Sequence, residues 1–347
     1  MDHIKMARRP TIIDLARESG LSIATVDRAL NGRPNVSDRA IARVAESAEK
    51  IGFYGAGLAL MRAAESMRPK LRLGFVLQKP EQYFYQNLGN SLDKEARARV
   101  DVQASAVVTY PATQSAEDYE RVIKQTGESC DAIAVVAPNL PQVSQALGRL
   151  RDAGKPVFTM LNDLGHADRL EYFGTDNLKV GRIAAWMLTT HLRAPGKLAV
   201  FVGSSRWHSH MLRETGFQSY LRDHAPTFEK MEAMINLDTR QLTYEATIDL
   251  LDRTPELRGM YIAGGGMEGA IAALREVRPP GKIALVVNEL TPESRAALSD
   301  RYVVMAIGTP VRALSRACVQ TMIDAAFKRS TAPQTILPSE LHVTESV

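Results

Sequence analysis

Short apolar runs alternate with amphipathic stretches from residue 71 to residue 307, and this alternation restricts the fold more than any other feature of the chain. The apolar runs cover residues 71–77, 100–108, 131–137, 155–161, 197–203, 257–263, 282–287 and 302–307. Amphipathic segments with helical spacing lie between them, for example residues 88–99, 118–126 and 143–153. Strands separated by helices form parallel sheets with helices on both faces. Eight or more strands in roughly 270 residues suit two doubly wound lobes better than one very wide sheet.

The composition is that of a soluble globular protein with more than one domain. Of the 347 residues, 45% are hydrophobic and 24% are charged. No apolar run is long enough for a membrane span, and the N-terminus lacks the apolar core of a secretory signal, so a cytoplasmic protein is expected. Cys130 and Cys318 lie far apart in the sequence and are expected to be buried free thiols.

Residues 11–31 predict two short helices joined by a tight turn. Thr11 can cap the first helix, with Asp14 three residues later as in a variant of the capping box. Gly20 can adopt the positive φ that a sharp turn between helices requires. Ser22 can cap the second helix. This is the pattern of a helix-turn-helix, in which the start of the second helix faces base edges in DNA.

A third amphipathic helix is predicted after Ser37 and completes a three-helix head. An ordinary helical hairpin at the head of an enzyme would contain the same turn, so the charge distribution matters. Residues 1–72 hold 13 Lys/Arg and 8 Asp/Glu, a net charge of +5, whereas the remaining residues hold 30 and 31, a net charge of −1. The excess positive charge therefore lies in the head, which suits a domain that faces DNA phosphates.

The run from Thr11 to Ser37, T-x-x-D-L-A…S-G-L-S-x-A-T-V-D-R-A-L-N-G…V-S, resembles the DNA-binding head of the lactose-repressor (LacI) family of bacterial transcription regulators. The length and the α/β body also match that family. The resemblance implies a helix-turn-helix head on a two-lobed, doubly wound parallel α/β body of the periplasmic-binding-protein type I-like kind. It also implies a repressor of a carbohydrate or related catabolic operon that is not an enzyme and needs no cofactor. Such a repressor binds operator DNA as a homodimer and responds to a small sugar-like effector.

The same resemblance assigns residues to DNA. It places Ile23, Ala24 and Thr25 at base-reading positions, Arg28 and Asn31 at further contacts, and Thr11 and Ser22 at phosphate contacts, which set register rather than sequence. Asp27 stands where the family usually has serine. Its carboxylate could accept a hydrogen bond from cytosine or repel phosphates, but we expect it to position Arg28.

The predicted domains are a DNA-binding head at residues 9–55, a hinge helix or linker at residues 56–70 and an effector-binding and dimerisation body at residues 71–347. Within the body, the N-lobe is expected to cover about 71–174 and 309–330, and the C-lobe about 175–308 and 331–347. These ranges follow the alternation of apolar and amphipathic segments and the family resemblance.

The hinge departs from the family, which usually has Pro-Asn and then a helix that forms on DNA and wedges a leucine into the minor groove. Here Gly55-Ala56-Gly57 replaces Pro-Asn, and Arg62 stands at the wedge position. Leu58, Leu60 and Met61 are nearby candidates for the wedge, and Leu58 and Met61 are the residues assigned to DNA. The glycines favour disorder in the free protein, and a plain linker is the alternative.

Candidate ligand groups follow the predicted strands, because ligands of parallel sheets bind beyond the carboxyl ends of the strands. They are Gln78, Tyr83, Phe84, Tyr85, Asn162, Asp163, Asp176, Trp207, Arg213, Asn288 and Glu289. Aromatic rings, carboxylates, amides and one arginine suit a polyhydroxylated ligand. By resemblance, Arg213 matches a sugar-contacting arginine, and Asn288 replaces the usual carboxylate. Gly264-Gly265-Gly266 replaces an Asn-Asp pair, and the expected ligand is a sugar, polyol or sugar acid.

Two other functions fit parts of the sequence. GGGMEG at residues 264–269 is a G-x-G-x-x-G run with Glu289 twenty residues beyond it, which would suit an NAD(P)-binding oxidoreductase. The run lies late in the chain, whereas that fingerprint normally opens a two-lobe array, so the regulator is favoured. His208 and His210 could ligate zinc, but no Cys or acidic partner stands at metal spacing, and no metal site is predicted.

Overall fold

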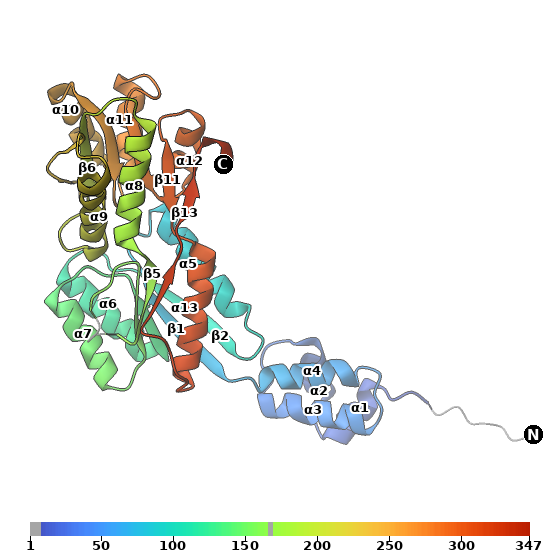
Figure 1. Ribbon diagram of the computed structural model, residues 1–347. Helices are drawn as coiled ribbons and strands as arrows, with labels where there is room; N and C mark the ends of the chain where they lie inside the picture. The colour runs from blue at the N-terminus through green and yellow to red at the C-terminus, as the bar shows by residue number, and fades with distance from the viewer. Residues whose placement is uncertain (1–7, 166–168) are drawn as a thin grey trace, which may run out of the picture. The chain divides into compact units, whose positions relative to one another are not determined.

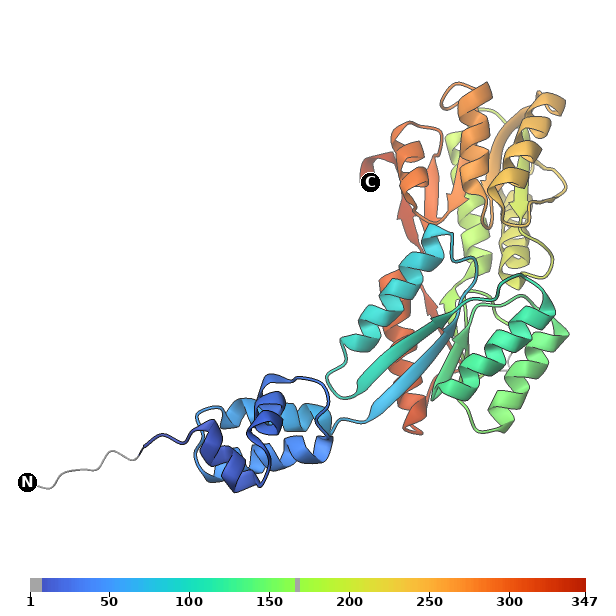
Figure 2. The ribbon, with the colours of Figure 1, turned by 180° about the vertical axis from the view of Figure 1, so that it is seen from behind.

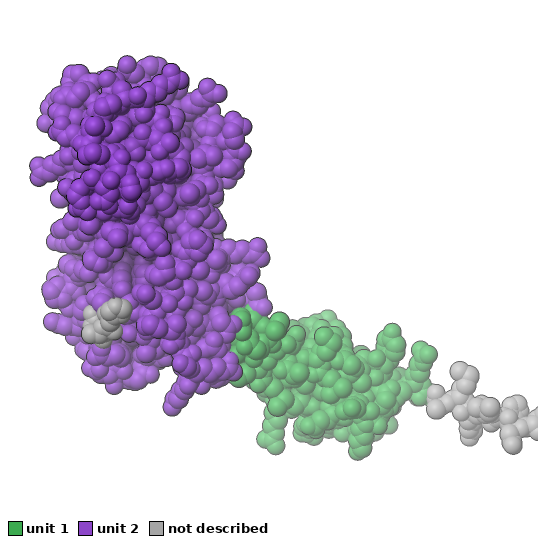
Figure 3. Space-filling view, in the orientation of Figure 1, with its two compact units in different colours: residues 1–71, 99–104 green, residues 72–98, 105–347 purple. Residues whose placement is uncertain are grey.

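The structure is a computed structural model that describes residues 8–165 and 169–347. It divides into two compact units (Figure 3). One is the head, up to Leu71 together with Arg99–Ala104, and the other is the body, Arg72–Ala98 with Ser105–Val347. In the described part of the chain, no helix is long and apolar enough to cross a membrane.

The head begins with the predicted helix-turn-helix. The helices are α1 (Ile12–Ser19), α2 (Ile23–Asn31) and α3 (Asp38–Lys50). Thr11 and Asp14 form the capping box of α1, and Ser22 caps α2 by accepting from the Thr25 amide. Gly20 ends α1 in the left-handed conformation at φ 63°, which lets the chain turn sharply into α2. Local sequence therefore sets this part of the head.

A fourth helix, α4 (Ala56–Ser66), covers the segment predicted as hinge or linker. Its Ala59 and Ala63, which share one face at i and i+4, are buried in the same apolar cluster as Leu15, Val26 and Val44. The expected three-helix head is thus a four-helix unit. The glycines at its start do not prevent the helix, because two small side chains let α4 pack closely on α3.

The body contains two sheets, each covered by helices on both faces (Figures 1 and 2). The first sheet has the order β12 (Gln334–Leu337), β5 (Glu171–Thr175), β4 (Val157–Met160), β3 (Ala132–Val135), β1 (Lys70–Val76) and β2 (Gln103–Thr109). The second has the order β13 (Glu340–His342), β11 (Met305–Gly308), β10 (Ala284–Asn288), β9 (Leu257–Ile262), β6 (Lys197–Val202) and β7 (Glu229–Lys230), with β8 (Met234–Ile235) also paired to β6. All eight predicted strands are present.

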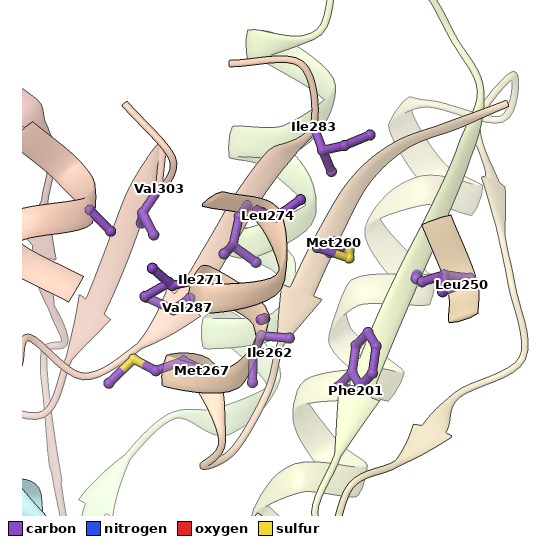
Figure 4. Packing of buried hydrophobic residues seen from close by; sticks show 14 of the residues in the cluster. Phe201, Leu250, Met260, Ile262, Met267, Ile271, Leu274, Ile283, Val287 and Val303 are labelled. Atoms are coloured by element: carbon purple, nitrogen blue, oxygen red, sulfur yellow. The ribbon is translucent and has the colours of Figure 1, made fainter. Parts of the chain in front are cut away.

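Helices sandwich each sheet. In the first lobe these are α5 (Tyr83–Arg97), α6 (Ala116–Ser129), α7 (Pro141–Asp152) and α13 (Val311–Ala326). In the second lobe they are α8 (Asn177–His191), α9 (His208–His224), α10 (Arg240–Arg253), α11 (Met267–Val277) and α12 (Pro292–Ser299), followed by the short 3-10 turn Thr344–Ser346. Along β9, Met260 and Ile262 pack under α10 and α11, whereas Tyr261 packs under α8 and α9. Figure 4 shows the first of these two layers. Burial on both faces explains the continuous apolar runs of the sequence.

The chain crosses between the lobes after β5, after β11 and after β12. The last crossing corrects one prediction, because residues 331–347 do not all belong to the C-lobe. β12 pairs in parallel with β5 at the edge of the first sheet, and only β13 pairs with β11 in the second. The sequence could not predict which sheet β12 and β13 join. Both are partly exposed edge strands, and an edge strand carries no continuous apolar run.

Candidate functional site

The start of α2 presents the side chains that the head motif assigns to DNA. Ile23 is 52% exposed, and Ala24 and Arg28 are also exposed. Val26, Ala29 and Leu30 of the same helix are buried. The outward face is therefore available to a groove while the inward face holds the helix on the head.

Asp27 does not position Arg28, and that expectation is wrong. Its carboxylate accepts from Asn31 Nδ2 at 2.7 Å and from the Arg33 guanidinium at 2.9 Å. Asn31 lies one helical turn further along, on the same face, so the i, i+4 pair forms readily. Asp27 thus ties the end of α2 to the following loop, and the side chain of Arg28 makes no hydrogen bond in the described residues.

Leu58 and Met61 lie on the exposed side of α4, at 50% and 65% exposure. Arg62, which stands at the wedge position in the sequence, is not directed to the same exposed side. Its Nη1 donates to the Ala29 carbonyl at 3.4 Å, and its guanidinium lies against Gly32 at the end of α2. The two apolar side chains remain candidates for a groove contact, while Arg62 joins α4 to α2.

Nine of the eleven predicted ligand residues line one cavity between the two lobes of the body. They are Gln78, Tyr83, Phe84, Tyr85, Asn162, Trp207, Arg213, Asn288 and Glu289. The space among the lining side chains is about 790 Å³, including the part that is open to solvent. The cavity lies beyond the carboxyl ends of β1, β4, β6, β9 and β10, where parallel sheets place ligands.

The other two predicted residues lie outside the cavity lining. Asp163 forms a bidentate ion pair with Arg169, with distances of 2.6 and 2.7 Å. Asp176 caps α8 by accepting from the Lys179 amide. Both follow strands, as predicted, but each carboxylate is used locally.

Sequence reasoning missed eight polar residues of the cavity, namely Lys79, Gln82, Ser209, His210, Asp238, Glu268, Thr291 and Thr309. Lys79 and Gln82 directly neighbour predicted residues, and His210 lies three residues from both Trp207 and Arg213, so a wider window would have included them. Asp238 follows β8, which has only two residues and no apolar run of its own. No sequence pattern marks its approach to the cavity.

Arg213 is the central cation of the cavity. It is 8% exposed, and it donates from Nε to Asn177 Oδ1 at 2.8 Å and from Nη1 to the Ala263 carbonyl at 2.7 Å. Asn288 accepts from the Tyr261 hydroxyl at 2.8 Å through Oδ1, which leaves its amide nitrogen for a ligand. The carboxylate of Glu289 accepts from the amide and the hydroxyl of Thr309.

Asp238, His210 and Thr243 explain the three consecutive glycines. Asp238 Oδ1 accepts from the Gly265 amide at 2.7 Å. A β-carbon on Gly264 would lie 2.3 Å from Asp238 Oδ1 and 2.4 Å from the His210 ring, and one on Gly266 would lie 2.2 Å from Thr243 Oγ1. Close packing therefore accounts for the run that the oxidoreductase hypothesis assigns to a dinucleotide.

Backbone strain is concentrated at the same place. Of the eight non-glycine residues with positive φ in the described chain, four line the cavity: Lys79, Leu161, Asp238 and Glu289. Such conformations persist where the surrounding structure holds them, and they cluster at functional sites. This observation supports a binding role for the cavity independently of side-chain chemistry.

The two lobes touch across the cavity through hydrogen bonds. Lys79 Nζ donates to the carbonyls of Leu237 and Asp238, both at 2.9 Å. The Ser209 amide donates to Asn162 Oδ1 at 2.9 Å. Few direct hydrogen bonds hold the lobes at this angle. A ligand that bridges the lobes can therefore stabilise one arrangement of the two lobes relative to another.

His210 is a neutral hydrogen-bond donor. The Gly203 amide donates to its Nδ1 at 3.2 Å, so the ring proton lies on Nε2, toward the cavity. Burial lowers the pKa of His210 to about 4, with Asp238 opposing the change and Arg213 and Lys79 adding to it. The imidazole is therefore uncharged at neutral pH.

Acidification should consequently destabilise the body through His210. The folded pKa lies below that of the unfolded chain, so the unfolded state binds more protons between about pH 6.5 and 4. We expect the wild type to lose about 3 kcal/mol more free energy of unfolding from pH 7 to 4 than H210Q. Urea unfolding at a series of pH values measures this. H191Q, at an exposed histidine of α8, should behave as wild type, and parallel curves for wild type and H210Q would contradict the assignment.

No group of three or more His, Cys, Asp or Glu side chains that could hold a metal ion occurs among residues 8–165 and 169–347. His208 is exposed, whereas His210 points inward. Cys130 and Cys318 are buried free thiols, as predicted.

Comparison with known families confirms both parts of the resemblance. Residues 11–55 match the model of bacterial regulatory proteins of the lacI family, and residues 73–330 match that of the periplasmic binding protein domain. Catabolite control protein A of Priestia megaterium is 31% identical over 83 residues, and this stretch is 24% of this chain and 24% of that protein.

Several solved structures share the fold of the body. A solute binding protein from Agrobacterium vitis, bound with alpha-D-tagatopyranose, has a TM-score of 0.72 at 19% identity and covers 79% of this chain and 95% of that one. One from Actinobacillus succinogenes with bound D-allose has a TM-score of 0.73 at 15% identity, covering 80% and 99%. GanP, a glucose-galactose binding protein from Geobacillus stearothermophilus, has a TM-score of 0.71 at 18% identity, covering 80% and 99%. At such identities the likeness establishes the fold alone.

Proposed function

Because the chain belongs to the periplasmic binding protein domain family through residues 73–330 and carries a lacI-family regulatory head at residues 11–55, we propose that it is a repressor of a carbohydrate or related catabolic operon. The head binds operator DNA, and a small polyhydroxylated effector binds between the lobes. The observation that carries this function is the convergence of nine predicted ligand residues on one cavity in a chain with a lacI-family head.

In this proposal α2 lies in the major groove. Ile23, Ala24 and Thr25 read base edges, and Arg28 and Asn31 add contacts further along the helix. Thr11 and Ser22, at the first turns of α1 and α2, contact phosphates. Leu58 and Met61 of α4 reach the minor groove. Asp27 acts through Asn31 and Arg33, which its carboxylate binds.

The effector side of the proposal uses the cavity and the structural neighbours together. Three neighbours of the same fold carry or are named for monosaccharides, and the cavity presents Tyr83, Phe84 and Trp207 beside amides and Arg213. Sugar C–H faces pack on aromatic rings, and sugar hydroxyls both donate and accept hydrogen bonds. Ligand binding changes the lobe angle and thereby operator affinity, by the 1 to 3 kcal/mol that is usual for allosteric coupling.

Two chains are expected to act as a homodimer on a pseudo-palindromic operator. Two-fold symmetry is the commonest arrangement of homo-oligomers, and it matches two operator half-sites. A single head offers too little surface for tight specific binding, whereas two linked heads bind in effect as one ligand.

The head assignment is tested with R28A. Loss of a base-contacting arginine should weaken operator binding by about 1 to 3 kcal/mol, or roughly 5- to 150-fold, because the other contacts remain. Fluorescence anisotropy with duplexes from the DNA upstream of its own gene, at low ionic strength, measures the affinity. R253A, at an exposed arginine of α10 that pairs with Asp249, is the matched control and should bind as wild type. Equal affinities for R28A and wild type would overturn the assignment of α2.

A further inference from the structure

A second, outer cavity adjoins the effector cavity. Five residues line both, namely Lys79, Gln82, Tyr83, Asp238 and Glu268. The outer cavity alone is lined by Glu81, Thr239, Arg240 and Glu293, and the inner one alone by Arg213, Asn288, His210 and others. A ligand in the inner cavity therefore meets an inner end at Arg213 and Asn288 and the junction with the outer cavity, with His210 beside the junction residue Asp238 at 3.9 Å.

The junction has an excess of negative charge. Carboxylates from Glu81, Asp238, Glu268 and Glu293 line the outer cavity against the cations of Lys79 and Arg240. Arg240 faces Glu293 at 3.6 Å, and the hydrogen bonds of the Lys79 ammonium go to main-chain carbonyls rather than to a carboxylate. Glu268 forms no ion pair within the described residues. Burial raises the pKa of its carboxyl group, and Arg240 and Lys79 act in the opposite direction.

The inner end is rich in donors without acceptors. Arg213 Nη2, Asn288 Nδ2 and His210 Nε2 make no hydrogen bond to protein in the part of the chain that the structure describes, although all three residues are less than a tenth exposed. These residues line the cavity, so a ligand with oxygen acceptors at this end would satisfy the three donors. The two ends of the cavity thus require opposite chemistry.

We propose that the effector is an amino sugar or amino polyol, whose protonated amine lies against Glu268 and Asp238 and whose hydroxyl oxygens accept from Arg213, Asn288 and His210. This inference rests on the proposed function, because it takes the cavity as the effector site. The sequence left a sugar, a polyol and a sugar acid open as the effector, and this inference favours an amine-bearing sugar or polyol over the sugar acid. An ammonium group donates three hydrogen bonds, and its positive charge supplies the ion-pair partner that the Glu268 carboxylate lacks.

A sugar acid fits the cavity in one orientation only. Its carboxylate would accept from Arg213, whose acceptors on Asn177 and Ala263 carry no charge, and would leave Glu268 without a counter-charge. Placed at the junction instead, the carboxylate would face Glu268 and Asp238. Like charges at short range in a partly buried site are strongly unfavourable.

The test compares compounds that differ at one substituent. Full-length protein is titrated calorimetrically, in the gluco, galacto and manno series, with the 2-amino sugar, the N-acetylated amino sugar, the parent hexose and the aldonic acid. The amino sugar should bind at least about tenfold more tightly than its parent in one series, and acetylation should remove the advantage because it removes the charge. The advantage should also decline as the pH rises through the pKa of the ligand amine. Tightest binding of an aldonic acid, or the absence of an amine advantage in all three series, would refute the inference.

Substitution of Glu268 locates the amine. E268Q should reduce the preference for the amino sugar over the parent hexose to about twofold or less, because glutamine keeps the shape and removes the charge. E276Q changes a glutamate of the same helix that contacts the Tyr244 hydroxyl instead, and it should keep the full preference. An undiminished preference in E268Q would place the amine elsewhere. Should E268Q fail to fold, the pH dependence of the wild-type preference decides the question alone.

Operator binding, measured in parallel, separates this inference from the proposed function. Release of operator DNA by a neutral sugar or a sugar acid, without an amine preference, would uphold the regulator and refute the amine. Failure to bind any upstream DNA would refute the regulator, whereas the calorimetric preference for the amine would stand or fall on its own result.

Discussion

G181A is expected to lower the free energy of unfolding of the body by about 3 kcal/mol or more. A β-carbon on Gly181 of α8 would lie 1.8 Å from the carbonyl oxygen of Arg213 in α9. Gly216 of α9 makes the reciprocal approach, at 2.0 Å from the Leu178 carbonyl. Because backbone faces backbone, no side chain can rotate away, and the two helices must separate.

Tryptophan fluorescence during urea unfolding measures this effect, since Trp186 and Trp207 both lie in the C-lobe. G148A is the control, because a β-carbon there would meet nothing within 4 Å and Gly148 lies inside α7. Circular dichroism should show that G148A is unchanged or stabilised by a few tenths of a kcal/mol up to about 1 kcal/mol, as for glycine to alanine in a helix. A G181A protein as stable as wild type would show that α8 and α9 do not cross this closely.

R213A should abolish the effector response while leaving operator binding intact. The substitution leaves Asn177 Oδ1 and the Ala263 carbonyl without their donor and removes the free Nη2 from the cavity. Hydrogen bonds to charged groups contribute about 1.5 to 3 kcal/mol each, so effector affinity should fall by roughly 100-fold. R213K should restore little, since one ammonium cannot reproduce the planar fork.

The measurement uses the hexose or amino hexose that stabilises the wild type most in a thermal-shift screen, together with operator anisotropy. R222A is the matched control, because Arg222 lies in the same helix, exposed and paired with Asp223. An R213A protein that still releases operator at the wild-type effector concentration would place the effector outside the described cavity.

Much of the site follows from the sequence, and the failures have specific causes. Gln78, Asn162 and Asn288 could be found because parallel strands bring their carboxyl ends to one edge. Asp163 and Asp176 satisfied the same rule, yet Arg169 and the first turn of α8 take up their carboxylates. A rule based on position after a strand cannot tell a free carboxylate from one that is already bonded.

The head shows the same division at smaller scale. Thr11, Gly20 and Ser22 act within one turn of the chain, so their roles as caps were predictable from neighbours alone. The contact of Arg62 with Ala29 spans 33 residues, and it depends on how α4 packs. From the sequence alone, the glycines at the start of the hinge predict a flexible segment. Helix propensity describes single residues and does not include the packing of α4 on the rest of the head.

By itself, the sequence determined the helix-turn-helix, the alternation of strands and helices, and the type of chemistry at the strand ends. These features depend on caps and periodicities that act over a few residues. Only the tertiary structure decided that Asp238 and Glu268 meet Arg213 and His210 around one cavity, that β12 returns to the first sheet, and that α4 joins the head. These arrangements join segments that are distant in the chain, and no local pattern specifies which of the buried polar groups face one another.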